Sequence, residues 1–354
     1  MNRNTPTRLP IRVLVVDDSA FMRTALSRMI TSESDMAVVG SAASGSDAIG
    51  RIASLDPDVV TLDVEMPGLG GLETLRCIMA QFPRPVIMVS AATEKDAEIT
   101  FNALALGAFD YVSKKLSCTS LDIQHIRRDL IAKIRAAYSA RGKKSPSTTA
   151  LADLGTNFVP PAIVALGTST GGPKALQEVL PLLPRDLPVP ILVVQHMPAG
   201  FTAPFAQRLN GLCPITVRQA IHEEPILPGV VYIAPAGMHM TVERRSESSA
   251  LICLDTQPEN CLHMPSVDVM MTSVASSYAS SAMGVILTGM GSDGAQGMKA
   301  IHLEGGLTVG QDETSCTVYG MPRACAELGV LRRVVPLSHI AAQILQATNY
   351  RKRA

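Results

Sequence analysis

Short apolar runs that alternate with amphipathic segments are the feature that most restricts the fold of this chain. In the first part of the sequence, such runs occupy residues 11–16, 36–42, 59–62, 86–89 and 111–112. Between the first two runs, apolar residues recur at the spacing of one helix face, at Met22, Leu26, Met29 and Ile30. Buried strands with helical crossovers form parallel sheets covered on both faces, so we expect a doubly wound α/β domain.

The same alternation returns after a break in composition. Residues 139–161 are rich in serine, threonine, proline and basic side chains, which is typical of a linker. Beyond them, apolar runs at residues 162–166, 191–195, 230–234 and 283–287 predict a second parallel sheet. We therefore expect an α/β protein with two doubly wound domains, at residues 10–135 and 161–348, joined by a linker at residues 136–160.

Composition argues against several classes of function. The 354 residues include 31 basic and 31 acidic side chains, so the net charge is zero and nucleic acid is not an expected partner. The seven cysteines are odd in number and show no C-x-x-C spacing, which favours a reducing compartment over disulfides or zinc. The sequence has no leader-like apolar region and no membrane-spanning run, so we expect a cytoplasmic protein without membrane insertion.

Carboxylates follow the strands of the first domain. Asp17 and Asp18 come directly after the first apolar run, and Asp63 follows the third. The carboxyl ends of parallel strands form a crevice, and carboxylates gathered there favour a Mg²⁺ ion. A carboxylate beside such an ion can accept a phosphoryl group, which Ser90 and Lys114, at the ends of the fourth and fifth strands, would bind. Each residue alone would more often be a helix cap or surface group, but five at successive strand ends favour a shared site.

These residues lie in segments that resemble response-regulator receiver domains. The matching segments are VVDDS at 15–19, LDVEMP at 62–67, VSA at 89–91 and YVSK at 111–114. The resemblance implies a flavodoxin-like fold and phosphorylation of Asp63 by a histidine kinase. It also implies Mg²⁺ held by Asp18, Asp63 and the Glu65 carbonyl, with Asp17 in the same acidic group.

Two positions depart from the receiver pattern. Receivers usually have proline after the strand-5 lysine, where this chain has Lys115. They commonly have Asp-Gly where this chain has Leu69-Gly70-Gly71. We expect both changes to affect loop shape, and with it relay speed or partner preference, rather than the phosphorylation chemistry.

The second domain opens with a glycine-rich turn around Ser169. The segment Gly167-Thr168-Ser169-Thr170-Gly171 fits the pattern G-x-S-x-G, follows an apolar strand, and precedes a helix that opens at Pro173. A serine in such a turn lies beside free amides at a helix N-terminus, which suit an oxyanion. The same amides suit a phosphate group, so the turn alone predicts either a nucleophile or a phosphate-binding loop.

Residues at the ends of two other strands favour the nucleophile. His196 follows the strand at 191–195 and is the candidate general base, with His239 and His263 as weaker candidates. Asp293 lies in the glycine-rich loop after the strand at 283–287. It is either the carboxylate that orients the histidine or the N-cap of the helix that follows.

The same loop supplies candidate oxyanion donors, namely the backbone amides near Met290. The chain order Ser–His–Asp differs from the order Ser–Asp–His of α/β-hydrolases. Because the same chemistry recurs on unrelated scaffolds, this order argues against the α/β-hydrolase fold and not against a triad.

Segments throughout the second domain closely resemble the CheB family of chemotaxis protein-glutamate methylesterases. They are GTSTGG at 167–172, QHMP at 195–198, YIAP at 232–235, PSVD at 265–268, LTGMGSDG at 287–294 and YGMP at 319–322. The resemblance implies a seven-stranded parallel sheet, with Ser169 as nucleophile, His196 as base and then acid, Asp293 as its orienting carboxylate, and the Met290 amide as oxyanion donor. Family members commonly have arginine where this chain has Met264, so a cationic substrate contact is missing or supplied elsewhere.

The resemblance also implies the substrate and the partners. A serine esterase of this kind, with no cofactor for the ester reaction, hydrolyses glutamate γ-methyl esters on methyl-accepting chemoreceptors and also deamidates receptor glutamines. A chemotaxis histidine kinase would supply the phosphoryl group. The domain order suggests that the unphosphorylated first domain covers the catalytic site. Two alternatives remain: a receiver-controlled phosphate- or nucleotide-binding module without enzymatic activity, and a receiver with a DNA-binding output, which the zero net charge disfavours.

Overall fold

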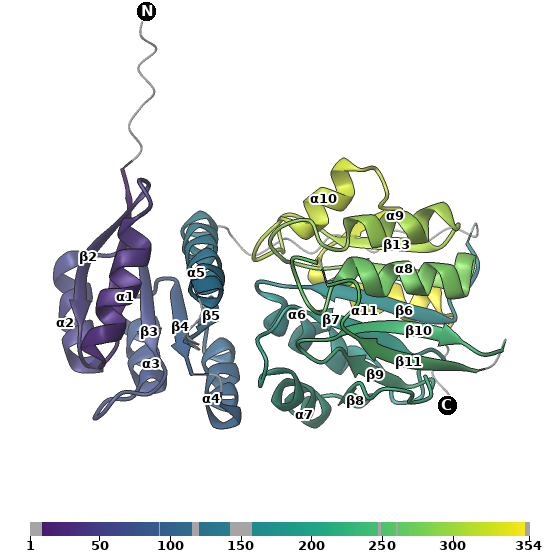
Figure 1. Ribbon diagram of the computed structural model, residues 1–354, viewed down its shortest axis with the longest axis horizontal. Coiled ribbons are helices and arrows are strands. Elements are labelled where there is room, and N and C mark those ends of the chain that lie inside the picture. Colours follow the sequence, from purple (N-terminus) through teal and green to yellow (C-terminus); the bar gives the residue numbers. More distant parts are fainter. Residues whose placement is uncertain are drawn as a thin grey trace, which may run out of the picture. The chain divides into compact units, whose positions relative to one another are not determined.

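The computed structural model of this protein describes residues 9–91, 93–114, 120–141, 158–246, 249–259 and 261–350. The chain divides into two compact units, one within residues 1–142 and the other within residues 143–354. Each unit is built on its own parallel sheet, and helices cover both faces of that sheet (Figure 1). The two doubly wound α/β folds expected from the sequence are therefore confirmed.

The first unit is a five-stranded sheet in the order β2-β1-β3-β4-β5. Its strands are β1 (Ile11–Val16), β2 (Met36–Ala42), β3 (Val59–Asp63), β4 (Val86–Ser90) and β5 (Asp110–Ser113). Its helices are α1 (Ala20–Thr31), α2 (Gly45–Leu55), α3 (Gly71–Gln81), α4 (Glu94–Ala105) and α5 (Ser120–Ala140). The strands match the predicted apolar runs, and β3 and β4 each extend one residue further, to Asp63 and Ser90.

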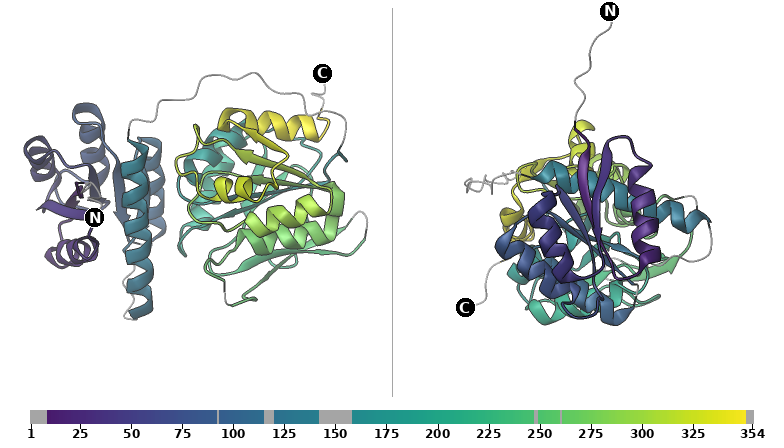
Figure 2. Two further views of the ribbon diagram at one scale, coloured as in Figure 1. Left: turned by 90° about the horizontal axis from the view of Figure 1, so that it is seen from above. Right: turned by 90° about the vertical axis from the view of Figure 1, so that its left-hand side faces the viewer.

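Helices α1 and α5 contact each other on one face of this sheet, and the right-hand view of Figure 2 shows helices on either side of the purple strands. Leu26 and Ile30 of α1 and Ile134 of α5 lie in one buried cluster with alternate residues of the strands. On the other face, α3 packs against both α2 and α4. Ala137 also belongs to the buried cluster, so α5 continues into the stretch that we assigned to the start of the linker.

The second unit is a seven-stranded sheet in the order β14-β13-β12-β6-β7-β9-β8, and every strand pairing in it is parallel. Its strands are β6 (Ile163–Thr168), β7 (Ile191–Gln195), β8 (Thr216–Gln219), β9 (Val230–Ile233), β12 (Ala282–Ile286), β13 (Leu307–Gln311) and β14 (Arg333–Val335). An antiparallel hairpin consists of β10 (His239–Arg244) and β11 (Ala250–Asp255). The seven parallel strands agree with the expectation from the resemblance.

Helices cover both faces of this sheet as well. They are α6 (Gly172–Val179), α7 (Thr202–Leu212), α8 (Val267–Tyr278), α9 (Ala295–Leu303), α10 (Met321–Glu327) and α11 (Leu337–Ala347). Two short 3-10 helices, Leu180–Leu182 and Ala279–Ser281, precede β7 and β12. On one face, α8 packs against both α9 and β10 of the hairpin, whereas α6 packs against α11.

The apolar face of α8 forms part of the core on its side of the sheet. Met270, Met271 and Val274 of this helix lie in one buried cluster with Ile163 and Ala165 of β6. In the part of the chain that the structure describes, no helix is both long and apolar enough to cross a membrane.

Candidate active site

Strand β6 delivers Ser169 to the carboxyl edge of the second sheet. The strand ends at Thr168 and α6 begins at Gly172, so the chain reverses direction within three residues. Gly171 has a φ of 77°, a conformation that favours glycine, and a Cβ there would lie 2.5 Å from the Thr317 side chain. A Cβ on Gly172 would lie 2.0 Å from Gln195 Oε1. The two glycines therefore permit the tight turn that the sequence predicted.

The strands on either side of β6 bring His196 and Asp293 to the same edge. In the order β12-β6-β7, His196 directly follows β7, and Asp293 lies between β12 and α9. The two side chains meet: His196 Nε2 lies 2.8 Å from Asp293 Oδ2, and the side chains are only 10% and 12% exposed. The predicted base and carboxylate are thus paired beside the strand that carries Ser169.

The pairing with Asp293 fixes the tautomer of His196. An ionised carboxylate only accepts hydrogen bonds, so we assign the hydrogen to Nε2. His196 Nδ1 is buried and has no hydrogen-bond partner in the described part of the chain. Nδ1 is therefore the nitrogen that can accept a proton from a serine. Among the described residues no hydrogen bond joins the Ser169 hydroxyl to His196, and such bonds are often long in ligand-free enzymes.

Asp293 is held at the N-terminus of α8. Its Oδ1 accepts hydrogen bonds from the Ser266 hydroxyl at 2.8 Å and the Asp268 amide at 2.9 Å, and Oδ2 accepts one from the Val267 amide at 2.8 Å. Burial raises the pKa of the Asp293 carboxyl, but the hydrogen bond and charge of the bound histidine, with these amides, outweigh burial and hold the pKa well below its ordinary value. The alternative role for Asp293, as N-cap of the following helix, is wrong, because the residue at the N-cap of α9 is Gly294.

The loop after β12 passes directly beside Ser169. The Ser169 amide donates to the Thr288 carbonyl at 3.1 Å. A Cβ on Gly289 would lie 3.0 Å from Ser169 Cβ, so the backbone of the loop approaches the serine as closely as glycine allows. The next amide, that of Met290, donates no hydrogen bond to any described residue. An unused donor next to the serine is what an oxyanion site requires.

Gln195 supports both Ser169 and His196, and we did not identify it from the sequence. Its Nε2 donates to the backbone carbonyl of Ser169 at 3.0 Å and to that of His196 at 2.9 Å. The residue is 2% exposed and ends an otherwise apolar strand. A buried amide at the end of such a strand was the available signal, but its two partners depend on the pairing of β6 with β7.

The weaker candidate His239 has a structural role. It is fully buried, its Nδ1 accepts a hydrogen bond from the Ser266 amide at 3.1 Å, and its Nε2 lies 3.2 Å from the Pro258 carbonyl. Both ring nitrogens are therefore engaged, and neither is left to act on a serine. Through Ser266, His239 supports the residue that binds Asp293.

The first unit places a second group of polar residues at the carboxyl edge of its own sheet. Asp17 follows β1 and Asp63 ends the neighbouring strand β3. One oxygen atom from each of Asp17, Asp18 and Asp63 lies within 4.8 Å of the others. Lys114 Nζ lies 2.9 Å from Asp17 Oδ2 and 2.5 Å from Asp63 Oδ2. The structure therefore brings together the three carboxylates and the lysine that the sequence singled out.

These carboxylates fit a divalent cation. Burial raises the pKa of the Asp63 carboxyl to about 6, because the hydrogen bond and charge of Lys114 only partly offset burial and the charge of Asp17. A cation would relieve this cost, and an all-oxygen ligand set suits Mg²⁺. The Glu65 side chain is exposed, whereas its amide donates to Asp63 Oδ1 at 3.2 Å, so the backbone of Glu65 lies beside Asp63.

Ser90 lies at the same edge, but its hydroxyl is engaged elsewhere. The Lys114 amide donates to the Ser90 carbonyl at 2.7 Å, which places the ends of β4 and β5 side by side. The Ser90 hydroxyl donates to the Ala91 carbonyl at 3.1 Å and accepts a hydrogen bond from Thr100 of α4 at 3.0 Å. To donate a hydrogen bond to a phosphate, this hydroxyl has to release the Ala91 carbonyl, while it can keep the bond that it accepts from Thr100.

Of the two departures from the receiver pattern, only one can be located. Gly70 is the N-cap of α3 and supplies no side-chain hydrogen bond there. Gly71 is required by close packing, since a Cβ on it would lie 2.0 Å from the Asp63 carbonyl oxygen. Lys115 lies outside the described residues.

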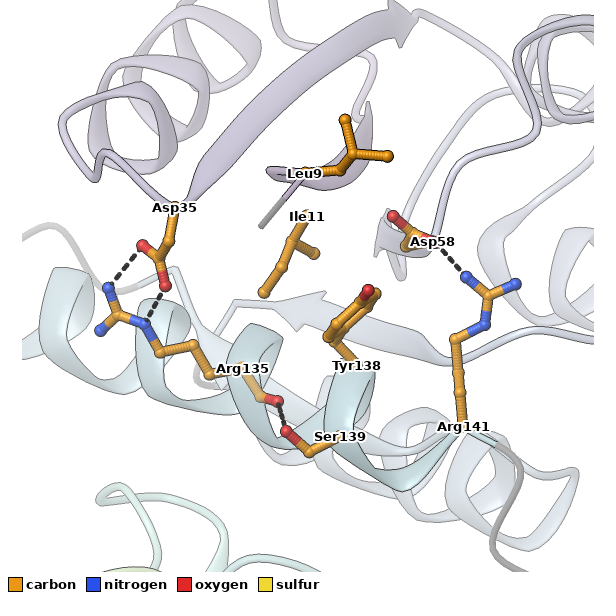
Figure 3. Close-up of a pocket in the computed structure, with 8 residues that line it drawn as sticks. All are labelled: Leu9, Ile11, Asp35, Asp58, Arg135, Tyr138, Ser139 and Arg141. Atoms are coloured by element: carbon orange, nitrogen blue, oxygen red, sulfur yellow. Dashed lines mark hydrogen bonds and ion pairs between the residues drawn. The ribbon is translucent and has the colours of Figure 1, made fainter. Parts of the chain in front are cut away.

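A pocket of about 640 Å³ in the first unit is separate from these groups (Figure 3). It lies at the opposite end of β1 from Asp17, where Ile11 begins the strand. Its charged side chains pair with one another, Arg135 with Asp35 and Arg141 with Asp58. The pocket contains none of the residues that the sequence singled out.

Known proteins share the organisation of both units. The family model for the CheB methylesterase matches residues 164–344, and that for the response regulator receiver domain matches residues 13–124. The chain is 45% identical to a protein-glutamate methylesterase/protein-glutamine glutaminase of Symbiobacterium thermophilum, over 96% of this chain and 97% of that protein. The chain belongs to the CheB methylesterase family.

Another member of the CheB family, from Bacillus subtilis, carries the same description and is 43% identical over 94% of this chain and 97% of its own length. The crystal structure of the Thermotoga maritima CheB methylesterase catalytic domain is 38% identical, with a TM-score of 0.51, and covers 53% of this chain and 99% of that chain. Family membership decides between the alternatives that the sequence left open. The second unit is a methylesterase domain, so the nucleotide-binding and DNA-binding outputs are both wrong.

Proposed function

We propose that this protein hydrolyses glutamate γ-methyl esters of methyl-accepting chemoreceptors, with Ser169, His196 and Asp293 as a catalytic triad. The observation that carries the proposal is the 2.8 Å pair between His196 and Asp293 at the strand end where Ser169 lies. The names of the relatives, protein-glutamate methylesterase/protein-glutamine glutaminase, supply the substrate class.

The reaction proceeds in two steps. Ser169 Oγ attacks the ester carbonyl while His196 Nδ1 takes the hydroxyl proton, and the Met290 amide donates to the resulting oxyanion. Collapse breaks the bond to the methoxy group, which leaves as methanol with the proton from His196. A water molecule, deprotonated by His196, then attacks the acyl-enzyme; the bond to Ser169 Oγ breaks, His196 returns the proton to Oγ, and the receptor side chain leaves as glutamate. With a glutamine side chain the same steps release ammonia.

Asp293 supports both steps by stabilising the imidazolium. Its lowered pKa keeps it ionised at neutral pH, so it accepts the Nε2 hydrogen throughout the cycle. Three donors from Ser266, Val267 and Asp268 hold the carboxylate in place. The histidine is thereby kept in one tautomer, with Nδ1 available to the serine proton.

The first unit acts as the switch in this proposal. Asp63 accepts a phosphoryl group from a chemotaxis histidine kinase, and Lys114 and a reoriented Ser90 bind the phosphate. Mg²⁺, held by Asp17, Asp18, Asp63 and the Glu65 carbonyl, would neutralise the charge of the transferred group. Phosphorylation relieves inhibition of the esterase by the first unit. The protein acts in the cytoplasm, where its kinase and the receptor methylation sites meet.

Methanol release from methylated receptor membranes tests the esterase. Ser169→Ala is expected to abolish release while circular dichroism and thermal unfolding remain unchanged. Ser276→Ala, which removes an exposed hydroxyl from α8 of the same unit, is the matched control and should keep full activity. Methanol release by Ser169→Ala at the normal rate would contradict the proposal.

A further inference from the structure

The catalytic histidine has a second neighbour besides Asp293. His263, in the segment between β11 and α8, stacks on the His196 ring with centroids 4.0 Å apart and planes at 19°. Asp293 contacts the edge of the His196 ring and His263 covers a face. Sequence spacing left His263 as a weaker candidate for the base, whereas the structure places it against the base.

The segment that carries His263 is anchored on both sides. The Gly237 amide donates to the carbonyl of Met264, the next residue along the chain, at 3.0 Å. Three residues after His263, Ser266 caps α8 and donates to Asp293. One stretch of chain therefore fixes both the carboxylate at the edge of His196 and the ring on its face.

We propose that His263 is a positioning residue for the esterase reaction, which holds the His196 ring in its catalytic plane and, when protonated, opposes the imidazolium that forms there. The inference rests on the proposed role of His196 as base. A single hydrogen bond to Asp293 leaves the imidazole free to tilt about the Nε2–Oδ2 line. Stacking removes this freedom, so Nδ1 stays directed where a serine proton must arrive.

Charge gives the stack a second effect. When His196 takes the Ser169 proton, it becomes a cation 4.0 Å from the His263 ring. A neutral His263 tolerates this cation, whereas a protonated one repels it. The Asp293 carboxylate contacts His196, and the Asp268 amide donates to that carboxylate. Burial and the charges of Asp293 and Asp268 raise the pKa of the Cys261 thiol, in the segment that carries His263. Both carboxylates favour positive charge on His196, which a protonated His263 opposes.

Two substitutions separate the ring from its charge. His263→Ala removes both, and we expect kcat for methanol release to fall about tenfold at pH 8 with KM within about twofold. His263→Phe keeps a flat ring but cannot be protonated, so we expect it to retain at least about half of the wild-type kcat. The acid limb of kcat/KM should then fall no more steeply than tenfold per pH unit, because the side chain at position 263 takes up no proton.

The control is His222→Ala, which removes an exposed histidine of the same unit and should leave the whole pH profile unchanged. If His263→Phe is poorly folded by thermal unfolding, His263→Tyr makes the same comparison. Equal losses in the alanine and ring variants, or no loss in either, would overturn the inference. Parallel assays of the wild type and Ser169→Ala keep it distinct from the proposed function. That function fails only if the wild type releases no methanol or Ser169→Ala still does.

Discussion

At the scale of single residues, the Asp293 carboxylate explains how the site is built from so few groups. It accepts hydrogen bonds from His196, Ser266, Val267 and Asp268, and three of these four donors belong to the start of α8. The positive end of a helix dipole favours a carboxylate at this position. The same contacts keep Asp293 ionised and immobile, which is what a histidine partner requires.

Asp293→Asn tests this account. The amide has a hydrogen-bond donor where the carboxylate has only acceptors, so it mispairs with the donors at α8 and no longer stabilises the imidazolium. We expect kcat to fall by roughly 10³- to 10⁴-fold, the scale seen when a serine protease loses its triad carboxylate. Ser266→Ala, which removes one donor of the four, should cost less than about tenfold. Methanol release by Asp293→Asn at the wild-type rate would exclude the triad.

The Asp63 carboxyl gives a prediction about stability. Its pKa is raised from the ordinary 3.8 to about 6, first by burial and then by the charge of Asp17, so the folded state binds its proton more tightly than the unfolded state. Stability that depends on Asp63 therefore falls as pH rises from about 4 to 6 and is constant above that range.

The Asp63→Asn variant does not lose this stability as the pH rises. Without Mg²⁺, we expect the variant to gain on the order of 1–2 kcal/mol over the wild type between pH 4.5 and 7, less than the ~3 kcal/mol of the full shift because part of the loss occurs below pH 4.5. Urea unfolding in EDTA at the two pH values measures the difference. Adding Mg²⁺ at pH 7 should stabilise the wild type and not the variant. A difference that is the same at both pH values would show that Asp63 titrates normally.

At the scale of elements, we could predict from the sequence which residues parallel strands bring to one edge of a sheet. We could not predict the contacts that depend on packing between elements. Ser169, His196 and Asp293 were found because each follows an apolar strand, and the carboxyl ends of parallel strands share one edge. The order β12-β6-β7 could not be predicted, so Asp293 was also assigned to α9, the helix next to it in sequence, whereas it binds α8. Gln195 and His263 were missed or undervalued for the same reason, since their partners lie on other elements.

Three strands of the second sheet could not be located from the apolar runs either. The edge strands β8 and β14 have four and three residues, too few for a period to show, and β14 is half exposed. Strand β13, with the sequence LTVGQ, is fully buried, but glycine and glutamine interrupt its apolar character. None of the three carries a residue of the candidate site, so the site was predictable although the sheet was incomplete.

The loop after β12 gives a prediction at this scale. A Cβ on Gly289 would lie 2.1 Å from Met321 Sδ and 3.0 Å from Ser169 Cβ, so Gly289→Ala must displace the loop that carries the Met290 amide. We expect kcat to fall by about 100-fold, because a shift of about 1 Å in an oxyanion donor costs this much. The unfolding free energy should fall by about 1–3 kcal/mol.

Gly211→Ala is the matched control for this substitution. Gly211 lies near the end of α7 with no atom within 4 Å of its added Cβ, so alanine should leave kcat unchanged and stabilise the helix slightly. Full methanol release by Gly289→Ala would show that the position of the loop does not matter for the oxyanion.

At the scale of the whole molecule, the chain contains two sheets, and each carries its candidate site residues at its carboxyl edge. In the first unit the gathered groups are carboxylates and a lysine, which suit a cation and a phosphoryl group. In the second they are a serine, a histidine and a carboxylate, which suit acyl transfer. One chain therefore contains both a receiver domain and a methylesterase domain, an arrangement that has a use if the first controls the second.

Control of this kind predicts that a small phosphodonor with Mg²⁺ accelerates methanol release by the full-length protein. A coupling free energy of 1–3 kcal/mol, typical of linked sites, corresponds to roughly 5- to 150-fold, and we expect about tenfold. Asp63→Asn should keep the basal rate and lose the response, since it removes the carboxylate that we propose as the phosphoryl acceptor. Asp47→Asn, which removes an exposed carboxylate on α2, should respond like the wild type. An equal response in Asp63→Asn would show that the switch lies elsewhere. Loss of the response when EDTA is added to the wild type would show that the response depends on the cation bound by these carboxylates.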